Sequence, residues 1–290
     1  MTWLLYPAVI AGSLLLAAAS LRLIGMKQWA DVMCAFTRRL EAARVDGASR
    51  PSMARYDAGE LQGLPAPVQR YFRAVLTDGQ PVIAAATIEM TGTINMSATS
   101  ENWKPFTSRQ HVVTKRPGFL WDAKVSMFPG LPVRVVDSYI AGQGRLIAKL
   151  LGLFTVADAC DGGELARGEL MRYFAEAAWY PTALLPSQGV RWEAVDDASA
   201  NANLVDGQLS LTLLFRFGEG DTIASVHAES RGAGVGRDMV MRPWDCSLSD
   251  YQPRDRMSIP MVGEAAWVQP GGRRAYFVGK VSALSYEFVP

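Results

Sequence analysis

The chain has 290 residues, of which 49% are hydrophobic and 20% are charged, so its length suffices for one large domain or two smaller ones. This composition excludes a disordered protein, which combines low hydrophobicity with high net charge. Because 29 basic residues stand against 28 acidic ones, the formal net charge of +1 offers no general attraction to nucleic acid. Three scattered cysteines and two histidines are too few for a disulfide framework or a cysteine-based zinc site, and we expect no metal and no cofactor.

Residues 2–21 contain no charged side chain. A helix of this length spans about 30 Å at about 1.5 Å per residue, which matches the hydrocarbon core of a bilayer. No Lys or Arg precedes the segment, and its apolar run is long for a signal peptide. We therefore predict a transmembrane anchor in residues 1–25. The alternative is a signal peptide that is cleaved after the small residues at 17–19.

The side of the membrane on which the rest of the chain lies is open. Basic residues outnumber acidic ones between the apolar segment and residue 50: Arg22, Lys27, Arg38, Arg39, Arg44 and Arg50 against Asp31, Glu41 and Asp46. By the positive-inside rule, this excess favours a cytoplasmic C-terminal domain. The β-rich pattern of the remaining chain is common outside the inner membrane and favours the opposite side. We therefore predict a single-pass membrane protein without assigning its orientation.

A second helix is expected directly after the apolar segment, in residues 26–44. Apolar residues recur there at intervals of three and four and form one face: Trp29, Val32, Met33, Phe36 and Leu40. Two interpretations remain open, since the helix would either lie on anionic lipid head groups or pack on the protein's own domain. Gly47 to Pro51 is expected to end the helix, so we assign residues 26–60 to a juxtamembrane helix and linker.

Residues 61–290 are predicted to form a single β-rich domain, which opens with a short helix at 65–76. Apolar and polar residues then alternate with a period of two, as in 87–96 and 208–217, which is typical of strands with one buried face. Further strands are predicted at 107–115, 119–125, 133–141, 145–151, 191–196, 199–205, 223–231, 238–247, 259–268 and 276–288. Short Gly- or Pro-containing breaks separate them and favour antiparallel meanders. The fold class is therefore mainly β (α+β), with an open or half-closed antiparallel β-barrel after the N-terminal transmembrane helix.

One long helix is predicted to interrupt the strands, at residues 162–179. Asp161 followed three residues later by Glu164 fits an N-cap with a returning acid. Pro181 ends the helix, because the residue before a proline avoids helical geometry. We expect this helix to lie across the curved sheet and to cap one mouth of the barrel.

The run GELARGELMRYFAEAAWYPTALLPSQGVRWEAVDD at residues 163–197 resembles a family of uncharacterised bacterial membrane-associated proteins, defined as a domain of unknown function. Three further stretches match its pattern, at residues 64–81, 103–144 and 263–267. The resemblance covers most of the chain after residue 60. It implies a single-pass protein of a bacterial inner membrane and no catalytic residue. At the level of the fold, the predicted order of sheet, long helix and further sheet is similar to the open β-barrel of lipoprotein carriers and sigma-factor regulators.

A charged stripe on the predicted long helix is the first candidate for a binding site. Glu169, Arg172 and Glu176 have the spacing that is usual for a solvent-exposed helix face, which is the interpretation we favour. The alternative is that the stripe orients a substrate or an inserted head group. Arg167 lies on the apolar side of the helix, where it would pass the edge of the core, pair with Glu164 or point a charge into a cavity.

Aromatic residues gather around the same helix: Tyr173, Phe174, Trp179, Tyr180 and Trp192, joined by Trp121, Trp244 and Trp267 from strands. Trp and Tyr can be buried while their polar tips find partners, as an amphiphile-binding cavity requires. Ordinary core packing is the more common reason for such residues, so the cavity is a hypothesis. The candidate ligand-binding residues are Arg167, Glu169, Arg172, Tyr173, Glu176, Trp179, Tyr180, Trp121 and Trp192.

Three hypotheses for the function follow. The leading one is a membrane-anchored protein that binds a membrane lipid or another amphiphile in the concavity of its sheet, with Arg167 or Arg172 meeting an anionic head group. The second is a protein-interaction or sensor module of the cell envelope, whose strand edges or charged helix face bind another protein. The third and least favoured is a hydrolase, because the sequence shows no nucleophile–base arrangement and we predict no catalytic residue.

Overall fold

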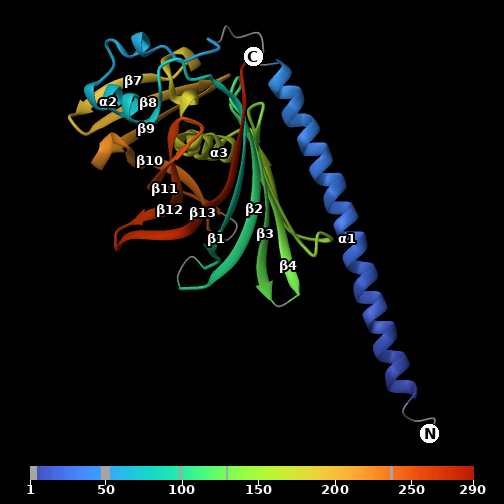
Figure 1. Ribbon diagram of the computed structural model, residues 1–290. Helices are drawn as coiled ribbons and strands as arrows, with labels where there is room; N and C mark the ends of the chain where they lie inside the picture. Colours follow the sequence, from blue (N-terminus) through green and yellow to red (C-terminus); the bar gives the residue numbers. More distant parts are fainter. Residues whose placement is uncertain (1–4, 47–52, 98–99, 129, 236–237) are drawn as a thin grey trace.

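The computed structural model of the chain describes residues 5–46, 53–97, 100–128, 130–235 and 238–290. The expected break at Gly47 to Pro51 lies outside these residues. A long N-terminal helix runs along one face of a large curved sheet, and a second helix lies on the opposite, concave face (Figure 1). The mainly β fold with an apolar N-terminal helix and an inserted helix is therefore confirmed.

Two antiparallel meanders make up the sheet. The first consists of β1 (Ile83–Asn95), β2 (Trp103–Val113), β3 (Gly118–Phe128), β4 (Leu131–Ile140), β5 (Gln143–Leu150) and β6 (Phe154–Asp161). The second consists of β7 (Arg191–Asp196), β8 (Ser199–Asp206), β9 (Leu209–Phe217), β10 (Ile223–Val235), β11 (Asp238–Arg254), β12 (Met257–Gln269) and β13 (Gly272–Phe288). Pairing of β1 with β13 joins the meanders.

In the described part of the chain, thirteen strands follow the order β6-β5-β4-β3-β2-β1-β13-β12-β11-β10-β9-β8-β7. The two edge strands, β6 and β7, do not pair with each other, so the sheet is an open barrel. The helical segments are α1 (Leu5–Asp46), α2 (Ala66–Val75) and α3 (Glu164–Ala175), with the short 3-10 turns η3 (Ala58–Leu61), η4 (Glu176–Trp179), η5 (Pro181–Leu184), η6 (Pro186–Gln188) and η7 (Glu219–Asp221).

The main hydrophobic core lies between the concave face of the sheet and the segment from α3 to η6. Residues alternate along β9 as expected, because Leu211, Leu213 and Phe215 are buried while Ser210, Thr212 and Arg216 face solvent. Phe174 of α3 packs edge-on against Phe215, with 5.5 Å between ring centroids. The inserted helix is thus fixed by apolar contacts to the second meander.

Helix α1 is one continuous helix, so the boundary placed at residue 25 falls inside it. Residues 9–24 are exposed, whereas Trp29, Phe36 and Leu40 are buried against the outer face of β1 to β5. Successive residues of a strand point to opposite faces. Leu120 of β3 therefore packs with α1, whereas its neighbours Phe119 and Trp121 belong to the concave core. The second half of α1 therefore packs on the protein's own domain, as one of the two interpretations expected.

Three local predictions need correction. Strand β6 was not predicted, because it is an edge strand whose residues are exposed on both faces and show no alternation. Strand β11 continues seven residues beyond the expected end at Ser247, since its pairing with β12 extends to Arg254. The helix predicted at 162–179 is α-helical only over Glu164–Ala175, with Gly163 as its N-cap, and the last turn is the 3-10 segment η4.

We expect Gly144→Ala to lower the free energy of unfolding by about 1–3 kcal/mol, the usual cost of overpacking. A Cβ atom at Gly144 of β5 would lie 2.7 Å from the backbone nitrogen of Ala166, where α3 crosses the strand. Denaturant unfolding of the detergent-solubilised chain measures the effect. Gly271→Ala is the matched control, because nothing lies within 4 Å of its Cβ position. Equal losses in both variants would show that the close crossing does not require glycine.

Candidate functional site

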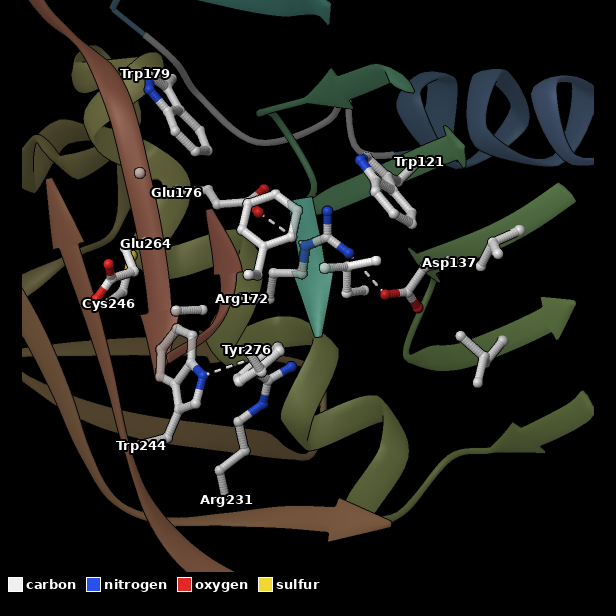
Figure 2. Close-up of a pocket in the computed structure, with 16 residues that line it drawn as sticks. Trp121, Asp137, Arg172, Glu176, Trp179, Arg231, Trp244, Cys246, Glu264 and Tyr276 are labelled. Atoms are coloured by element: carbon white, nitrogen blue, oxygen red, sulfur yellow. Dashed lines mark hydrogen bonds and ion pairs between the residues drawn. The ribbon is translucent and has the colours of Figure 1, made fainter. Parts of the chain in front are cut away.

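A cavity of about 230 Å³ lies between the two meanders, next to the end of α3 (Figure 2). Apolar side chains line most of it: Ile94, Trp121, Val135 and Phe277 from the two halves of the sheet, and Trp179 from η4. Its polar groups are concentrated where Asp137, Arg172, Glu176, Arg231 and Tyr276 meet. The site is therefore a largely apolar hollow with one charged region, contributed by elements that are distant in the sequence.

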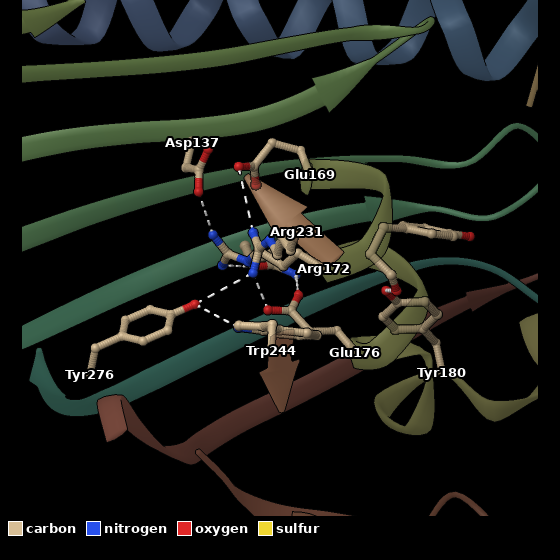
Figure 3. Close-up of polar contacts among 10 residues, drawn as sticks. Asp137, Glu169, Arg172, Glu176, Tyr180, Arg231, Trp244 and Tyr276 are labelled. Carbon is tan, nitrogen blue, oxygen red and sulfur yellow. Dashed lines mark hydrogen bonds and ion pairs between the residues drawn. The ribbon is translucent and has the colours of Figure 1, made fainter. Parts of the chain in front are cut away.

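Arg172 is the best-connected charge in this region (Figure 3). Its Nε donates to Glu176 Oε1 at 2.8 Å, Nη1 donates to Asp137 Oδ2 at 2.7 Å and Nη2 donates to Gln110 Oε1 at 3.0 Å. Gln110 Nε2 in turn donates to Glu176 Oε2 at 2.6 Å. All three nitrogen atoms of the guanidinium thus have an acceptor, and α3 is bonded to β2, β4 and η4.

Aromatic rings and carboxylates together stabilise the Arg172 cation. Its guanidinium lies 4.9 Å from the ring centroids of Phe119 and Trp121. Burial lowers the pKa of Arg172, but the surrounding carboxylates of Glu176, Asp137 and Glu169 outweigh burial and raise it above its ordinary value. We conclude that Arg172 has a structural role, since it holds α3 in place and has few donors left for a ligand.

Arg231 of β10 has much poorer partners, although it is only 8% exposed. Nη1 is 3.4 Å from the Tyr276 hydroxyl, Nη2 is 3.8 Å from Glu169 Oε1, and Nε has no acceptor among the described residues. The guanidinium also lies 4.6 Å from the ring centroid of Trp244. Arg231 therefore stacks on an aromatic wall of the cavity and keeps hydrogen-bond donors unused.

Glu169 lies beside Arg231 and is protonated more readily than an ordinary glutamate. Burial is the main cause and the negative charge of Asp137 is the second, and together they raise the pKa of Glu169 to about 8. The positive charges of Arg231 and Arg172 offset part of this effect. A carboxyl whose pKa is raised in this way is a weaker counter-charge for Arg231 than an ordinary glutamate.

Cys246 also lines the cavity. Burial is the main reason why the pKa of its thiol is raised to about 12. A thiol with such a pKa stays protonated at neutral pH and is a weak nucleophile. No group of three His, Cys, Asp or Glu residues that could hold a metal ion occurs within the described ranges.

The structure separates the nine candidate residues into four groups. Four line the cavity: Trp121, Arg172, Glu176 and Trp179. Glu169 adjoins it through Arg231, while three aromatic residues are buried in the core: Tyr173, Tyr180 and Trp192. Arg167 does not line the cavity; its Nη1 donates to the Ser230 carbonyl at 2.9 Å and pairs with Glu164 at 3.9 Å.

The prediction that Glu169, Arg172 and Glu176 form a solvent-exposed helix face is wrong. Glu169 and Glu176 are buried and Arg172 is nearly so, because the curved sheet covers this side of the helix as well as its apolar side. Sequence reasoning also missed Asp137 and Arg231. The alternation pattern did not predict an inward-facing Arg231, because β10 contains a bulge.

Strand β10 changes face between Ala228 and Arg231. Val226 and Ala228 are buried, so strict alternation would point Ser230 inward and Arg231 outward. A register shift in the pairing with β11 between Ala228 and Arg231 reverses this order, and Arg231 becomes the inward residue. A bulge of this kind is not visible in the sequence pattern.

The fold and the site together define an open antiparallel β-barrel protein with a helix inside the concave face. The chain belongs to a family of unknown function, DUF6920, whose model matches residues 62–286, so the expected membership of an uncharacterised family is confirmed. No curated protein matches the chain. Among solved structures it is similar to a LolA superfamily protein from Nitrosomonas europaea, with a TM-score of 0.40 and 8% identity, over 79% of this chain and 96% of that chain.

We expect Glu169→Gln to change the pH dependence of stability. The ordinary pKa of this carboxyl is 4.5 and the folded value is about 8, so between these values the unfolded chain releases a proton that the folded chain retains. The contribution of this group to the free energy of unfolding is fully present below pH 4.5 and is lost as the pH rises to 8. The variant should lack this fall, which thermal unfolding at stepped pH in one detergent would measure.

Glu229→Gln is the matched control for this experiment, because the Glu229 side chain is 91% exposed. The control should keep the slope of the wild-type chain. An unchanged slope in Glu169→Gln would show that Glu169 ionises normally in the folded protein.

Proposed function

We propose that this protein is anchored in a bacterial inner membrane by the first half of α1 and binds an amphiphilic, lipid-like molecule in the cavity. The apolar part of the ligand would occupy the hollow, and its anionic group would bind Arg231. The observation that carries this proposal is a buried arginine with unused donors in the wall of a largely apolar cavity.

The apolar lining supports binding of a short hydrocarbon segment. Transfer of each methylene group from water into such surroundings contributes about 0.8 kcal/mol. A cavity of about 150 Å³ holds one benzene molecule in another protein, so a hollow of about 230 Å³ has room for a short alkyl chain. A larger amphiphile would leave part of its chain outside.

The charge of Arg231 supports an anionic group on the ligand. A buried cation with poor partners is unfavourable, and a carboxylate or phosphate oxygen would supply the missing acceptors. The raised pKa of Glu169 reduces the negative charge that such an anion would meet beside Arg231. Arg172 would remain bonded to Gln110, Asp137 and Glu176 throughout.

Helix α1 supports the anchoring. It is long and apolar enough to cross a membrane by length and composition, and its residues 9–24 are exposed. Either orientation of the domain is compatible with the proposed ligand, since a bilayer presents lipid on both sides.

A second candidate function is favoured by the edge of the sheet. Strand β6 has no neighbour on its outer side in the described structure and exposes Phe154 and Val156. An envelope protein would bind there by adding a strand. A hydrolase is less supported, because Asp137 and Glu176 are both engaged by Arg172 and Cys246 is a protonated thiol.

We expect Arg231→Gln to abolish the preference of the cavity for an anionic ligand. Decanoic acid and decanol, each carrying a diazirine near the methyl end, are the probes, and mass spectrometry maps the cross-linked peptides of the full chain in nanodiscs. In the wild-type chain, the acid should label peptides of β11 and β12 on the order of tenfold more than the alcohol, since a hydrogen bond to a charged group contributes about 1.5–3 kcal/mol.

Arg167→Gln is the matched control and should keep the preference, because Arg167 lies outside the cavity. Ala265→Phe fills the cavity and should remove labelling by both probes. Labelling of other surfaces alone, or equal labelling of the wild-type cavity by the two probes, would contradict the proposal.

A further inference from the structure

We propose that the β3–β4 hairpin and the β5–β6 turn rest in the head-group layer of an anionic bilayer, beside the point where α1 leaves it. This inference depends on the membrane anchoring proposed above, and it adds which end of the domain meets the lipid. The occupant is therefore a bilayer surface that contains phosphate head groups.

Contacts with α1 fix the position of both turns. Arg22 Nη2 donates to the Gly130 carbonyl in the β3–β4 hairpin at 3.2 Å. Gly25 packs against the β5–β6 turn so closely that a Cβ atom would overlap the Leu151 carbonyl oxygen. Because β3–β4 and β5–β6 are antiparallel pairs of one meander, their turns lie at the same end of the sheet.

The apolar part of α1 extends beyond this end of the sheet (Figure 1). Residues 5–21 measure about 25 Å along the helix at about 1.5 Å per residue, close to the thickness of a hydrocarbon core. Arg22 is the first charged residue after this segment and would lie at the head groups. The turns that touch Arg22 and Gly25 would then lie at the same depth.

Large apolar side chains are exposed where the bilayer would be. Phe128 is 64% exposed, Leu131 41% and Phe154 58%. The first two flank the β3–β4 turn, and Phe154 begins β6 directly after the β5–β6 turn. Exposure of three such residues at one end of a sheet is unfavourable in water, whereas insertion into the boundary between head groups and acyl chains would bury them.

Basic residues accompany these apolar ones. A hollow of about 600 Å³ between α1 and the outer face of the sheet is lined by Arg22, Lys124 and Arg134. The one carboxylate in its lining, Asp122, already accepts two hydrogen bonds from Arg134, at 2.9 and 3.0 Å. Arg22 and Lys124 remain to attract lipid phosphates, so the charge of this end complements an anionic membrane.

The arrangement would also give the proposed ligand a route from the bilayer. A second hollow of about 240 Å³ shares Tyr276 with the cavity and reaches Met96, where β1 ends. Pairing of Asn95 with Trp103 puts the end of β1 beside the start of β2, at the same end of the sheet as the β3–β4 hairpin. An amphiphile would therefore have a short path from the membrane surface through the second hollow to the cavity.

Site-specific labelling tests this inference on the full chain. Phe128→Cys and Val195→Cys are prepared in a Cys34→Ser, Cys160→Ser background and labelled with an NBD fluorophore, and buried Cys246 is retained. Val195 is the matched control, because it is also exposed (49%) but lies next to the β7–β8 turn, at the end of the sheet opposite to the β3–β4 hairpin. The labelled chains are reconstituted into vesicles of phosphatidylcholine and phosphatidylglycerol, and flotation reports insertion.

We expect the label at 128 to gain intensity and shift to the blue in vesicles, and the label at 195 to keep its emission in water. Lys124→Gln, or vesicles of phosphatidylcholine alone, should weaken the response at 128. A chain that floats but gives a water-like signal at both positions would overturn the docking and leave the anchoring intact. A chain that does not float would overturn both the docking and the anchoring. An unaltered response in vesicles without phosphatidylglycerol would overturn the preference for an anionic membrane.

Discussion

The buried guanidinium of Arg172 is the constraint on which the interior of this protein depends. An arginine taken out of water must have acceptors, because an uncompensated buried charge costs several kcal/mol. Gln110, Asp137 and Glu176 supply them from three different elements, so the bonds fix the end of α3 against the first meander. The space beside this network stays partly unfilled and forms the cavity.

Two arginines in one cavity have different roles because their partners differ. Arg172 is fully bonded and stabilises the architecture, whereas Arg231 stacks on Trp244 and has long, weak polar contacts. The raised pKa of Glu169 contributes to this difference, since an ordinary, ionised glutamate would pair more strongly with Arg231. The site thus combines a rigid frame with one cation whose hydrogen-bond donors are only partly used.

Helix α1 combines two environments in one element. Its first half is exposed and apolar, and its second half is packed on the outer face of the sheet through Trp29, Phe36 and Leu40. A continuous helix with a packed half holds the domain at a fixed angle to the exposed half. Any membrane crossed by the first half would therefore meet the same end of the sheet each time.

The sequence by itself determined the elements whose signals are local: the apolar run of α1, the alternation in strands such as β9, and the position of the inserted helix. Only the tertiary structure decided which side chains form the site. The curvature of the sheet buried the charged stripe around Arg172, and a bulge in β10 turned Arg231 inward against the alternation. Curvature and bulges arise from pairing between strands, so no periodicity within a single strand reveals them.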